Sequence, residues 1–145
     1  MKALIQRVSQ AKVTAEGEVT GEIGKGIVVL LGVTHDDTEK DVDYLVNKIA
    51  DLRIFPSEKS GFDQSLTDVK GSLLVVSQFT LHASTKKGRR PDFTASARPE
   101  LAERLYDLFI EKAREKGLNT ATGRFGAMMD VELVNDGPVT LMIES

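Results

Sequence analysis

Apolar and polar residues alternate through the first third of the chain, a pattern typical of strands with one buried face. The alternation runs through residues 3–8, and the stretches 12–14 and 18–20 flank Glu16-Gly17 as the two arms of a hairpin. Residues 26–33 read Gly-Ile-Val-Val-Leu-Leu-Gly-Val and are apolar almost throughout, as expected of a central strand. The pattern predicts that the N-terminal third is mostly sheet.

The period of the apolar positions changes to that of a helix in two places. The first helix opens at Asp37-Thr38, where Thr38 and Asp41 have the spacing of a capping box. Its apolar positions share one face, which we expect to pack on the sheet: Val42, Leu45, Val46, Ile49 and Leu52. The second helix begins near Pro99-Glu100, ends near Lys116-Gly117, and has an apolar side formed by Leu101, Leu105, Leu108 and Phe109.

The remaining segments predict further strands. Residues 72–81 form a second apolar strand, and residues 118–120 and 130–133 return to strand-like composition. The closing stretch, 133–145, has strand-forming residues on both sides of Asn135-Asp136-Gly137-Pro138, which interrupts the last strand. We predict one α/β domain over residues 1–145, with a mixed, largely antiparallel, barrel-like sheet and two main helices.

Composition and charge narrow the classes of function. The chain has 145 residues, is 41% hydrophobic and carries a net charge of -3, which argues against a uniformly basic nucleic-acid surface but permits a local basic patch. It has no cysteine, so disulfides, a thiolate nucleophile and cysteine metal sites are excluded. No signal-peptide core is present, and no apolar run approaches the ~20 residues that span a bilayer. A cytoplasmic protein with no membrane partner is expected.

Neither a metal nor a cofactor is predicted. The two histidines, His35 and His82, lack the spacing of metal ligands. Residues 21–26, Gly-Glu-Ile-Gly-Lys-Gly, precede a strand, whereas a phosphate-binding loop connects a strand to a helix. We interpret these glycines as turn glycines.

Small polar residues gather where the strand 72–81 ends, with Ser77, Gln78 and Thr80 surrounding Phe79. Ser77 lacks the flanking glycines of a nucleophile elbow, and the sequence places no His/Asp pair beside it. Two interpretations remain open for this strand end: a site that holds an ester carbonyl, or a solvated end without function.

Two other segments are equally ambiguous. A loop kept irregular by Gly88 and Pro91 is either solvated or a phosphate contact, and it carries Lys86, Lys87, Arg89 and Arg90. The segment 122–129, Thr-Gly-Arg-Phe-Gly-Ala-Met-Met, either packs into the core or offers the apolar wall of a pocket.

Five segments together resemble the D-aminoacyl-tRNA deacylase family. They are MKALIQRVSQAKVT at the N-terminus, SQFTL from residue 77, TKKGRRPDF from residue 85, TGRFGAMM from residue 122 and NDGPVT from residue 135. They occur in the order and at the spacing of that family over essentially the whole chain.

The resemblance implies a homodimeric enzyme that cleaves the ester of D-aminoacyl-tRNA. It also implies removal of glycine mischarged on tRNA(Ala), rejection of L-aminoacyl substrates, and RNA but not DNA as partner. The implied catalytic residues are Ser77, Gln78, Phe79 and Thr80. The implied substrate-binding residues are Phe125, Gly126, Ala127, Met129, Gly137, Pro138, Lys86, Lys87, Arg89 and Arg90. The resemblance further implies that a cis Gly137-Pro138 peptide of the other subunit enters the pocket, where we expect its carbonyls to crowd the position of an L side chain.

Two mechanisms are compatible with these residues. Either Thr80 is a nucleophile, or backbone donors near Phe79 and Thr80 stabilise the oxyanion while the ribose 2′-hydroxyl helps to position water. The second is favoured because the sequence supplies no general base for Thr80, and His82 is assigned no role. The alternative function is a non-catalytic module that binds the tRNA acceptor end without releasing the amino acid; a purely structural dimer domain would do neither.

Overall fold

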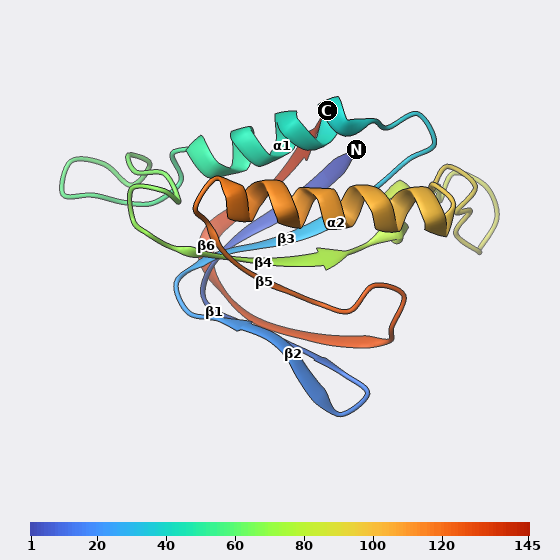
Figure 1. The fold of residues 1–145 in the computed structure, drawn as a ribbon, viewed down its shortest axis with the longest axis horizontal. Coiled ribbons are helices and arrows are strands. Elements are labelled where there is room, and N and C mark those ends of the chain that lie inside the picture. The colour runs from blue at the N-terminus through green and yellow to red at the C-terminus, as the bar shows by residue number, and fades with distance from the viewer.

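The sheet is organised around one long strand. In the computed structural model, which describes residues 1–145, β1 (Lys2–Ala15) pairs antiparallel with β3 (Gly26–Gly32) along its first half and with β2 (Glu18–Ile23) along its second half. On its other side β1 pairs antiparallel with β6 (Met129–Glu144) along both halves. Next to β3, the strands β4 (Ser72–Ser77) and β5 (Asn119–Thr122) are added in parallel (Figure 1). The predicted mixed, largely antiparallel sheet is confirmed.

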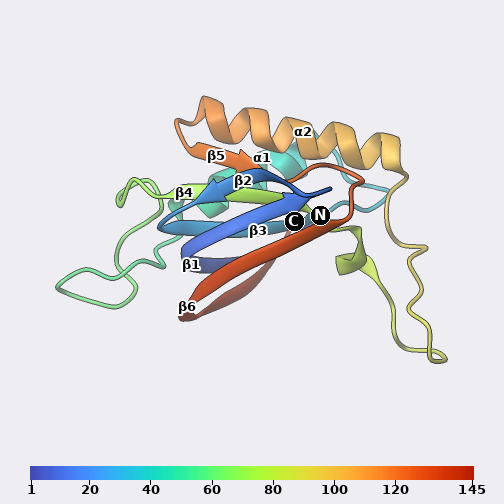
Figure 2. The same ribbon diagram turned by 90° about the horizontal axis from the view of Figure 1, so that it is seen from below.

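The sheet curls until it is nearly a closed barrel. Figure 2 shows β6 along one edge of the sheet and β5, beside α2, along the other. Strand β2 returns close to β5, since a Cβ added at Gly21 would lie 2.5 Å from the carbonyl oxygen of Thr122. The interior is filled by seven buried side chains: Val8, Ala11, Val13, Ile23, Val28, Leu74 and Val76.

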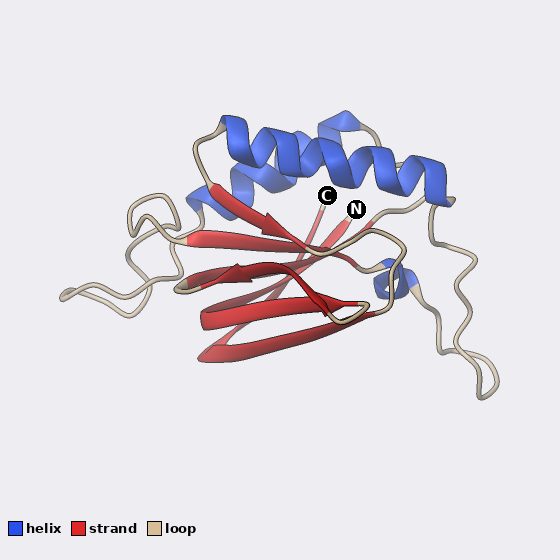
Figure 3. Cartoon of the chain, turned by 60° about the horizontal axis from the view of Figure 1, so that its bottom comes forward, coloured by secondary structure: helices blue, strands red, loops and turns tan.

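Two helices lie side by side over one face of the sheet, α1 (Glu39–Asp51) and α2 (Pro99–Glu115) (Figures 1 and 3). The larger core of 25 buried residues lies mainly between these helices and the sheet. The capping box of Thr38 and Asp41 is present, and Pro99 is the first residue of α2. Gly117, with φ +86°, terminates α2 in the left-handed conformation that glycine favours. No helix is long and apolar enough to cross a membrane.

Two of the strand predictions are wrong in extent. Residues 3–8 and 12–14 belong to the single strand β1, not to two strands. The strand predicted over 72–81 ends at Ser77, where its last pairing with β3 is to Leu31, and Phe79–His82 form a 3-10 helix, η1. Gln78 still donates its backbone N–H to Leu31, but its φ of -143° and ψ of 78° turn the chain out of the sheet.

The interruption in the last segment does not divide it into two strands. β6 continues from residue 129 to residue 144, and its register with β1 shifts on both sides of Val8. The Asn135 side-chain amide donates to the carbonyl oxygens of Arg7 and Val139, both at 3.0 Å, so it supplies bonds that the ladder lacks there. The Gly137-Pro138 peptide is cis.

The sequence analysis interpreted all the glycines of residues 21–26 as turn glycines. That interpretation is wrong for two of them. Gly21 lies within β2 and Gly26 begins β3, where a Cβ would lie 1.9 Å from the carbonyl oxygen of Ser72. Gly24 has open space around the same position. The close approach of β3 to β4 therefore requires glycine at residue 26 but not at residue 24.

Gly26→Ala is expected to lower the free energy of unfolding by at least about 1–3 kcal/mol, because the methyl group meets backbone that must move. Gly24→Ala is the matched control and is expected to stay within about 0.5 kcal/mol of the unaltered protein. Urea denaturation followed by circular dichroism measures both. Equal stability of the two variants would contradict this account of the β3–β4 contact.

Candidate active site

The residues Ser77, Gln78, Phe79 and Thr80 lie at the carboxyl end of β4, where the strand passes into η1. The i to i+3 hydrogen bonds begin with Leu81, whose N–H donates to Gln78 at 3.3 Å. The N–H groups of Phe79 and Thr80 come before this bond and have no partner within the helix. Two adjacent backbone donors therefore stand at the open start of η1.

The hydroxyl of Thr80 has no base beside it. Its oxygen accepts a hydrogen bond from the Gln78 side-chain amide, a group that donates and cannot remove a proton. No carboxylate or imidazole is bonded to Thr80, and the buried Nε2 of His82 has no hydrogen-bond partner in the chain. A hydroxyl in this setting is not activated as a nucleophile.

The backbone and the ring of Phe79 are both held by a segment that follows the loop of cations. Phe79 is 54% exposed, and its ring packs edge to face with that of Phe93, at 5.3 Å between ring centroids. The carbonyl oxygen of Phe79 accepts a hydrogen bond of 2.9 Å from the Ser96 hydroxyl. The sequence analysis missed both contacts, because no local pattern indicates them.

The basic loop, residues 84–92, is closed at its base by two hydrogen bonds between Ser84 and Asp92, of 2.8 and 2.9 Å. Its four cations, Lys86, Lys87, Arg89 and Arg90, are exposed, and none forms an ion pair within the chain. The pKa of Asp92 is lowered because the backbone N–H of Thr94 donates to its carboxylate. Figure 3 shows η1 as the short helix from which this long loop begins.

The segment 122–129 reaches the same edge of the sheet and is partly used for packing. β5 runs parallel to β4, so the residues after it emerge at the edge where Ser77 lies. Phe125 packs on the larger core, with its ring 5.9 Å from that of Tyr106, and Met129 packs on the barrel interior. Gly126, with φ +73°, and the half-buried Ala127 complete the bend between them.

Tyr106 fixes this region from α2. Its hydroxyl donates to the carbonyl oxygen of Val75 at 2.9 Å, and burial raises the pKa of Tyr106. A groove next to Tyr106 and Phe125 is lined by carboxylates that would repel phosphate: Glu103, Asp107, Glu111 and Glu115. Arg124, also on this groove, is already paired with Glu16 and Glu18 of the β1–β2 hairpin.

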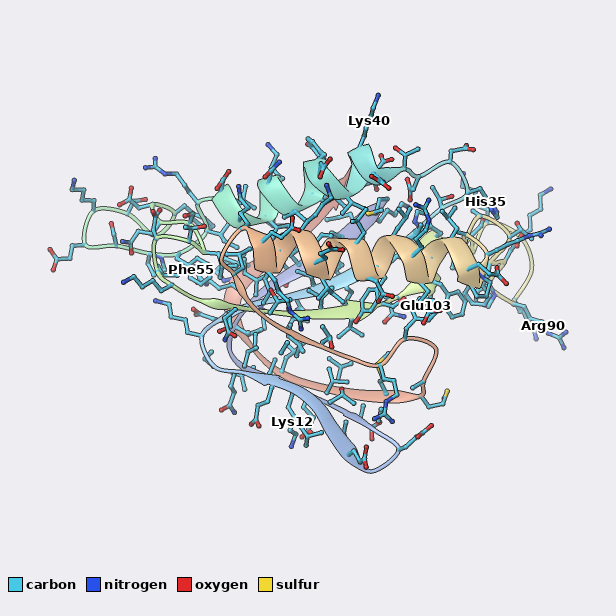
Figure 4. The ribbon with its side chains drawn as sticks, in the orientation of Figure 1. Lys12, His35, Lys40, Phe55, Arg90 and Glu103 are labelled. Carbon is cyan, nitrogen blue, oxygen red and sulfur yellow. The ribbon has the colours of Figure 1, made fainter.

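Gly137 and Pro138 are not brought to this site within one chain. Through the paired registers, Arg7 beside the turn lies opposite Ile27, which lies opposite Leu73 at the start of β4. Ser77 is four residues further along β4, or about 13 Å at 3.3 Å per residue. Figure 4 shows Phe55, next to the Arg7 partner Ile54, on the opposite side of the molecule from Arg90 of the basic loop.

Arg7 holds this turn and was also missed by the sequence analysis. Its guanidinium donates to the carbonyl oxygens of Ile54, Asp136 and Gly137, and it lies 3.0 Å from the Asp136 carboxylate. The residue is only 6% exposed. The sequence did contain a signal: Arg7 occupies a position that the alternation of β1 predicts to be buried. A buried cation needs partners, so a structural role could have been inferred.

No group of three or more His, Asp or Glu side chains is arranged to hold a metal ion.

The comparisons with known proteins agree over the whole chain. The family described as D-Tyr-tRNA(Tyr) deacylase matches residues 4–144. A protein of Brevibacillus brevis named D-aminoacyl-tRNA deacylase is 57% identical over 145 residues, covering 100% of both chains. A protein of Clostridioides difficile with the same name is 55% identical, covering 100% of this chain and 97% of its own.

Two solved structures have the same fold. One is named c-Myc DNA Unwinding Element Binding Protein, has a TM-score of 0.93 and 44% identity, and is matched over 100% of this chain and 99% of its own. The other, described as a probable eukaryotic D-amino acid tRNA deacylase, has a TM-score of 0.86 at 19% identity, over 99% and 98%, and supports the fold alone. The resemblance inferred from five sequence motifs is thereby confirmed, and the chain belongs to the D-Tyr-tRNA(Tyr) deacylase family.

Proposed function

We propose that this chain hydrolyses the ester bond of D-aminoacyl-tRNA and releases the free D-amino acid and tRNA. Family membership over nearly the full length supports this, as do the names of its relatives. The observation that carries the proposal is the pair of backbone N–H groups of Phe79 and Thr80 at the open start of η1. Such donors stabilise an oxyanion without a reactive side chain, which suits a labile aminoacyl ester.

In the proposed mechanism, water adds to the ester carbonyl carbon. The resulting oxyanion accepts hydrogen bonds from the N–H groups of Phe79 and Thr80. The ribose 2′-hydroxyl of the substrate helps to position the water. The carbon–oxygen bond to the ribose 3′-oxygen then breaks, one proton of the added water passes to the 3′-oxygen, and the other is released to solvent as the amino acid leaves as its carboxylate. The lack of a base beside Thr80 supports this route over nucleophilic attack by its hydroxyl.

Phe79→Pro tests the backbone mechanism directly, because proline removes the N–H of residue 79 and is tolerated at the first position of a helix. Its kcat is expected to fall about 10²- to 10³-fold, the usual effect of losing one oxyanion donor. Phe79→Ala, which loses the ring but keeps the N–H, should lose less kcat than Phe79→Pro, and Thr80→Ala keeps every backbone donor. A Thr80→Ala variant as inactive as Phe79→Pro would instead favour the nucleophile.

The proposed specificity is for D-aminoacyl esters and for glycine mischarged on tRNA(Ala), with L-aminoacyl esters rejected. In this proposal the carbonyls of the Gly137-Pro138 turn of a second subunit occupy the space that an L side chain needs. Exclusion by backbone discriminates without contacts to the D side chain, so glycine is also accepted.

Deacylation of D-Tyr-tRNA, L-Tyr-tRNA and Gly-tRNA(Ala), each followed by loss of labelled amino acid, measures this specificity. We expect release from the first and third and none above the spontaneous rate from the second. Binding of all three without any release would favour the alternative, a non-catalytic module for the tRNA acceptor end.

The proposal requires a twofold homodimer, because the Gly137-Pro138 turn and the Ser77–Thr80 region are separated in space within one subunit. β6 is paired on one side only, and three large apolar residues along it are about half exposed: Val134, Leu141 and Met142. An unpaired strand edge with apolar neighbours is typical of an interface between copies. The exposed Gly137 lies within the same stretch of β6.

Mixing two inactive variants tests whether the subunits share their sites. Gly137→Val should leave folding intact, since a Cβ there meets only the Asn135 side chain at 3.6 Å, but it should block a partner pocket. When Gly137→Val and Phe79→Pro chains are refolded together, half of the dimers are mixed and have one intact site each. Activity should return to about one quarter of the unaltered enzyme. No recovery, with mixed dimers verified by mass spectrometry, would contradict a shared site.

The four cations of the basic loop are proposed to contact tRNA phosphates. Lys86→Gln with Arg89→Gln should weaken binding of every tRNA and reduce the slope of log Kd against log salt by about 1 to 2. Lys40→Gln with Lys116→Gln is the control, because it removes two exposed cations elsewhere. An unchanged slope in the loop variant would mean that the loop is only solvated.

DNA is not a proposed partner, although one similar structure is named for binding a DNA element. The net charge of -3 leaves the basic loop as a local feature, and single-stranded DNA is a suitable competitor in the binding assay. The cytoplasm, where aminoacyl-tRNA is used, is the proposed location.

A further inference from the structure

Phe79 is held by two residues that lie outside the segment proposed to contact the ester. Ser96 donates its hydroxyl hydrogen to the Phe79 carbonyl oxygen at 2.9 Å, and Phe93 packs its ring against that of Phe79. The carbonyl of Phe79 belongs to the same peptide as the N–H of Thr80. A bond to that carbonyl therefore sets the direction in which one proposed oxyanion donor points.

The segment that carries these residues, 93–97, is itself fixed to the chain that follows β3. Ala97 donates its N–H to the carbonyl oxygen of Val33 at 2.9 Å, and the Thr34 hydroxyl donates to Ala95 at 2.6 Å. The ring of His35 lies 2.7 Å from the Thr94 carbonyl oxygen. Ser96 thus approaches Phe79 from a support that is anchored at three points.

The same segment continues directly from the basic loop. Asp92, which closes the loop against Ser84, precedes Phe93 in the chain, and its carboxylate accepts from the N–H of Thr94. Any ordering of the loop is therefore transmitted to Phe93 through one peptide bond. Phe93 is 39% exposed, so its contact with Phe79 is not enforced by burial.

We propose that Ser96 and Phe93 are positioning residues: Ser96 fixes the Phe79-Thr80 peptide for the reaction, and Phe93 couples it to phosphate binding on the basic loop. This inference rests on the proposed function. Binding of tRNA phosphates orders the loop, and the ordered loop holds Phe93 against Phe79. The Phe79-Thr80 peptide is then already fixed when the ester binds, so less conformational entropy is lost in that step. A tRNA ester is consequently hydrolysed faster than an ester too short to reach the loop.

The test compares kcat and KM of the full-length protein on two substrates, D-Tyr-tRNA and 3′-O-(D-tyrosyl)adenosine, which has the same ester but no phosphate. Ser96→Ala should lower kcat about tenfold on both, with KM changed by less than about twofold. Ser96→Thr, which keeps a hydroxyl, should restore kcat. Phe93→Ala should lower kcat on the tRNA substrate and leave the short substrate unaffected.

Two controls match these substitutions. Ser60→Ala removes an exposed hydroxyl outside the basic loop and the segment 93–97, one that only accepts a hydrogen bond from the Phe62 backbone N–H, and Phe62→Ala removes an exposed phenylalanine that has no aromatic partner. Both should behave as the unaltered enzyme on both substrates. Thermal unfolding of each variant separates loss of folding from loss of positioning.

Three results with the variants would overturn the inference while leaving the proposed function intact. An unchanged kcat in Ser96→Ala removes the role of the hydroxyl, and a Ser96→Thr variant as slow as Ser96→Ala assigns the defect to packing. A Phe93→Ala variant equally slow on both substrates removes the coupling to the loop. If the unaltered enzyme releases no D-tyrosine from either substrate, the proposed function fails and this inference with it; an active enzyme that is insensitive at Ser96 sinks the inference alone.

Discussion

The pairing of β1 with three strands at once decides where every functional group of this chain lies. Because β1 pairs with β3 on one side and β6 on the other, the turn at Gly137 is held at the level where β4 begins. The Ser77–Thr80 region is held where β4 ends. The buried guanidinium of Arg7 adds direct bonds from β1 to that turn. One strand therefore separates two groups that the proposed reaction needs together, which is why the proposal calls for a second subunit.

The donors that the Ser77–Thr80 region offers to a substrate are backbone N–H groups, so the region needs no charged side chains around it. The end of β4 and the start of η1 present N–H groups without any arrangement of charged side chains. The surrounding contacts, from Ser96, Phe93 and Gln78, act on the conformation of that backbone. The direction of the backbone N–H groups then depends on these contacts around η1, since a peptide group has no rotamers by which it could adjust.

The sequence predicted the two helices, their caps and the mixed, largely antiparallel character of the sheet, because these follow from local spacing and composition. Thr38 with Asp41 and Pro99 with Gly117 mark the helices as expected. The end of β4 was placed four residues late, since Phe79 and Leu81 continue an apolar pattern while the pairing partner ends at Gly32. Arg7, Phe93 and Ser96 were missed for a related reason: their partners are distant in the chain, and each residue type alone suggests only a surface or core position.

The separation of charge over the surface has a kinetic consequence. The groove along α2 is lined by four carboxylates, Glu103, Asp107, Glu111 and Glu115, against two arginines, whereas the unpaired cations lie in the loop 84–92, whose Arg90 projects at one end of the molecule. This distribution gives the protein an electric dipole despite its small net charge of -3. A polyanion that approaches along α2 is repelled, and one that approaches the cationic end is attracted over about one Debye length, ~8 Å at physiological salt. A polyanion is thus oriented toward the cationic loop before it contacts the protein, and its collisions with the α2 side are brief.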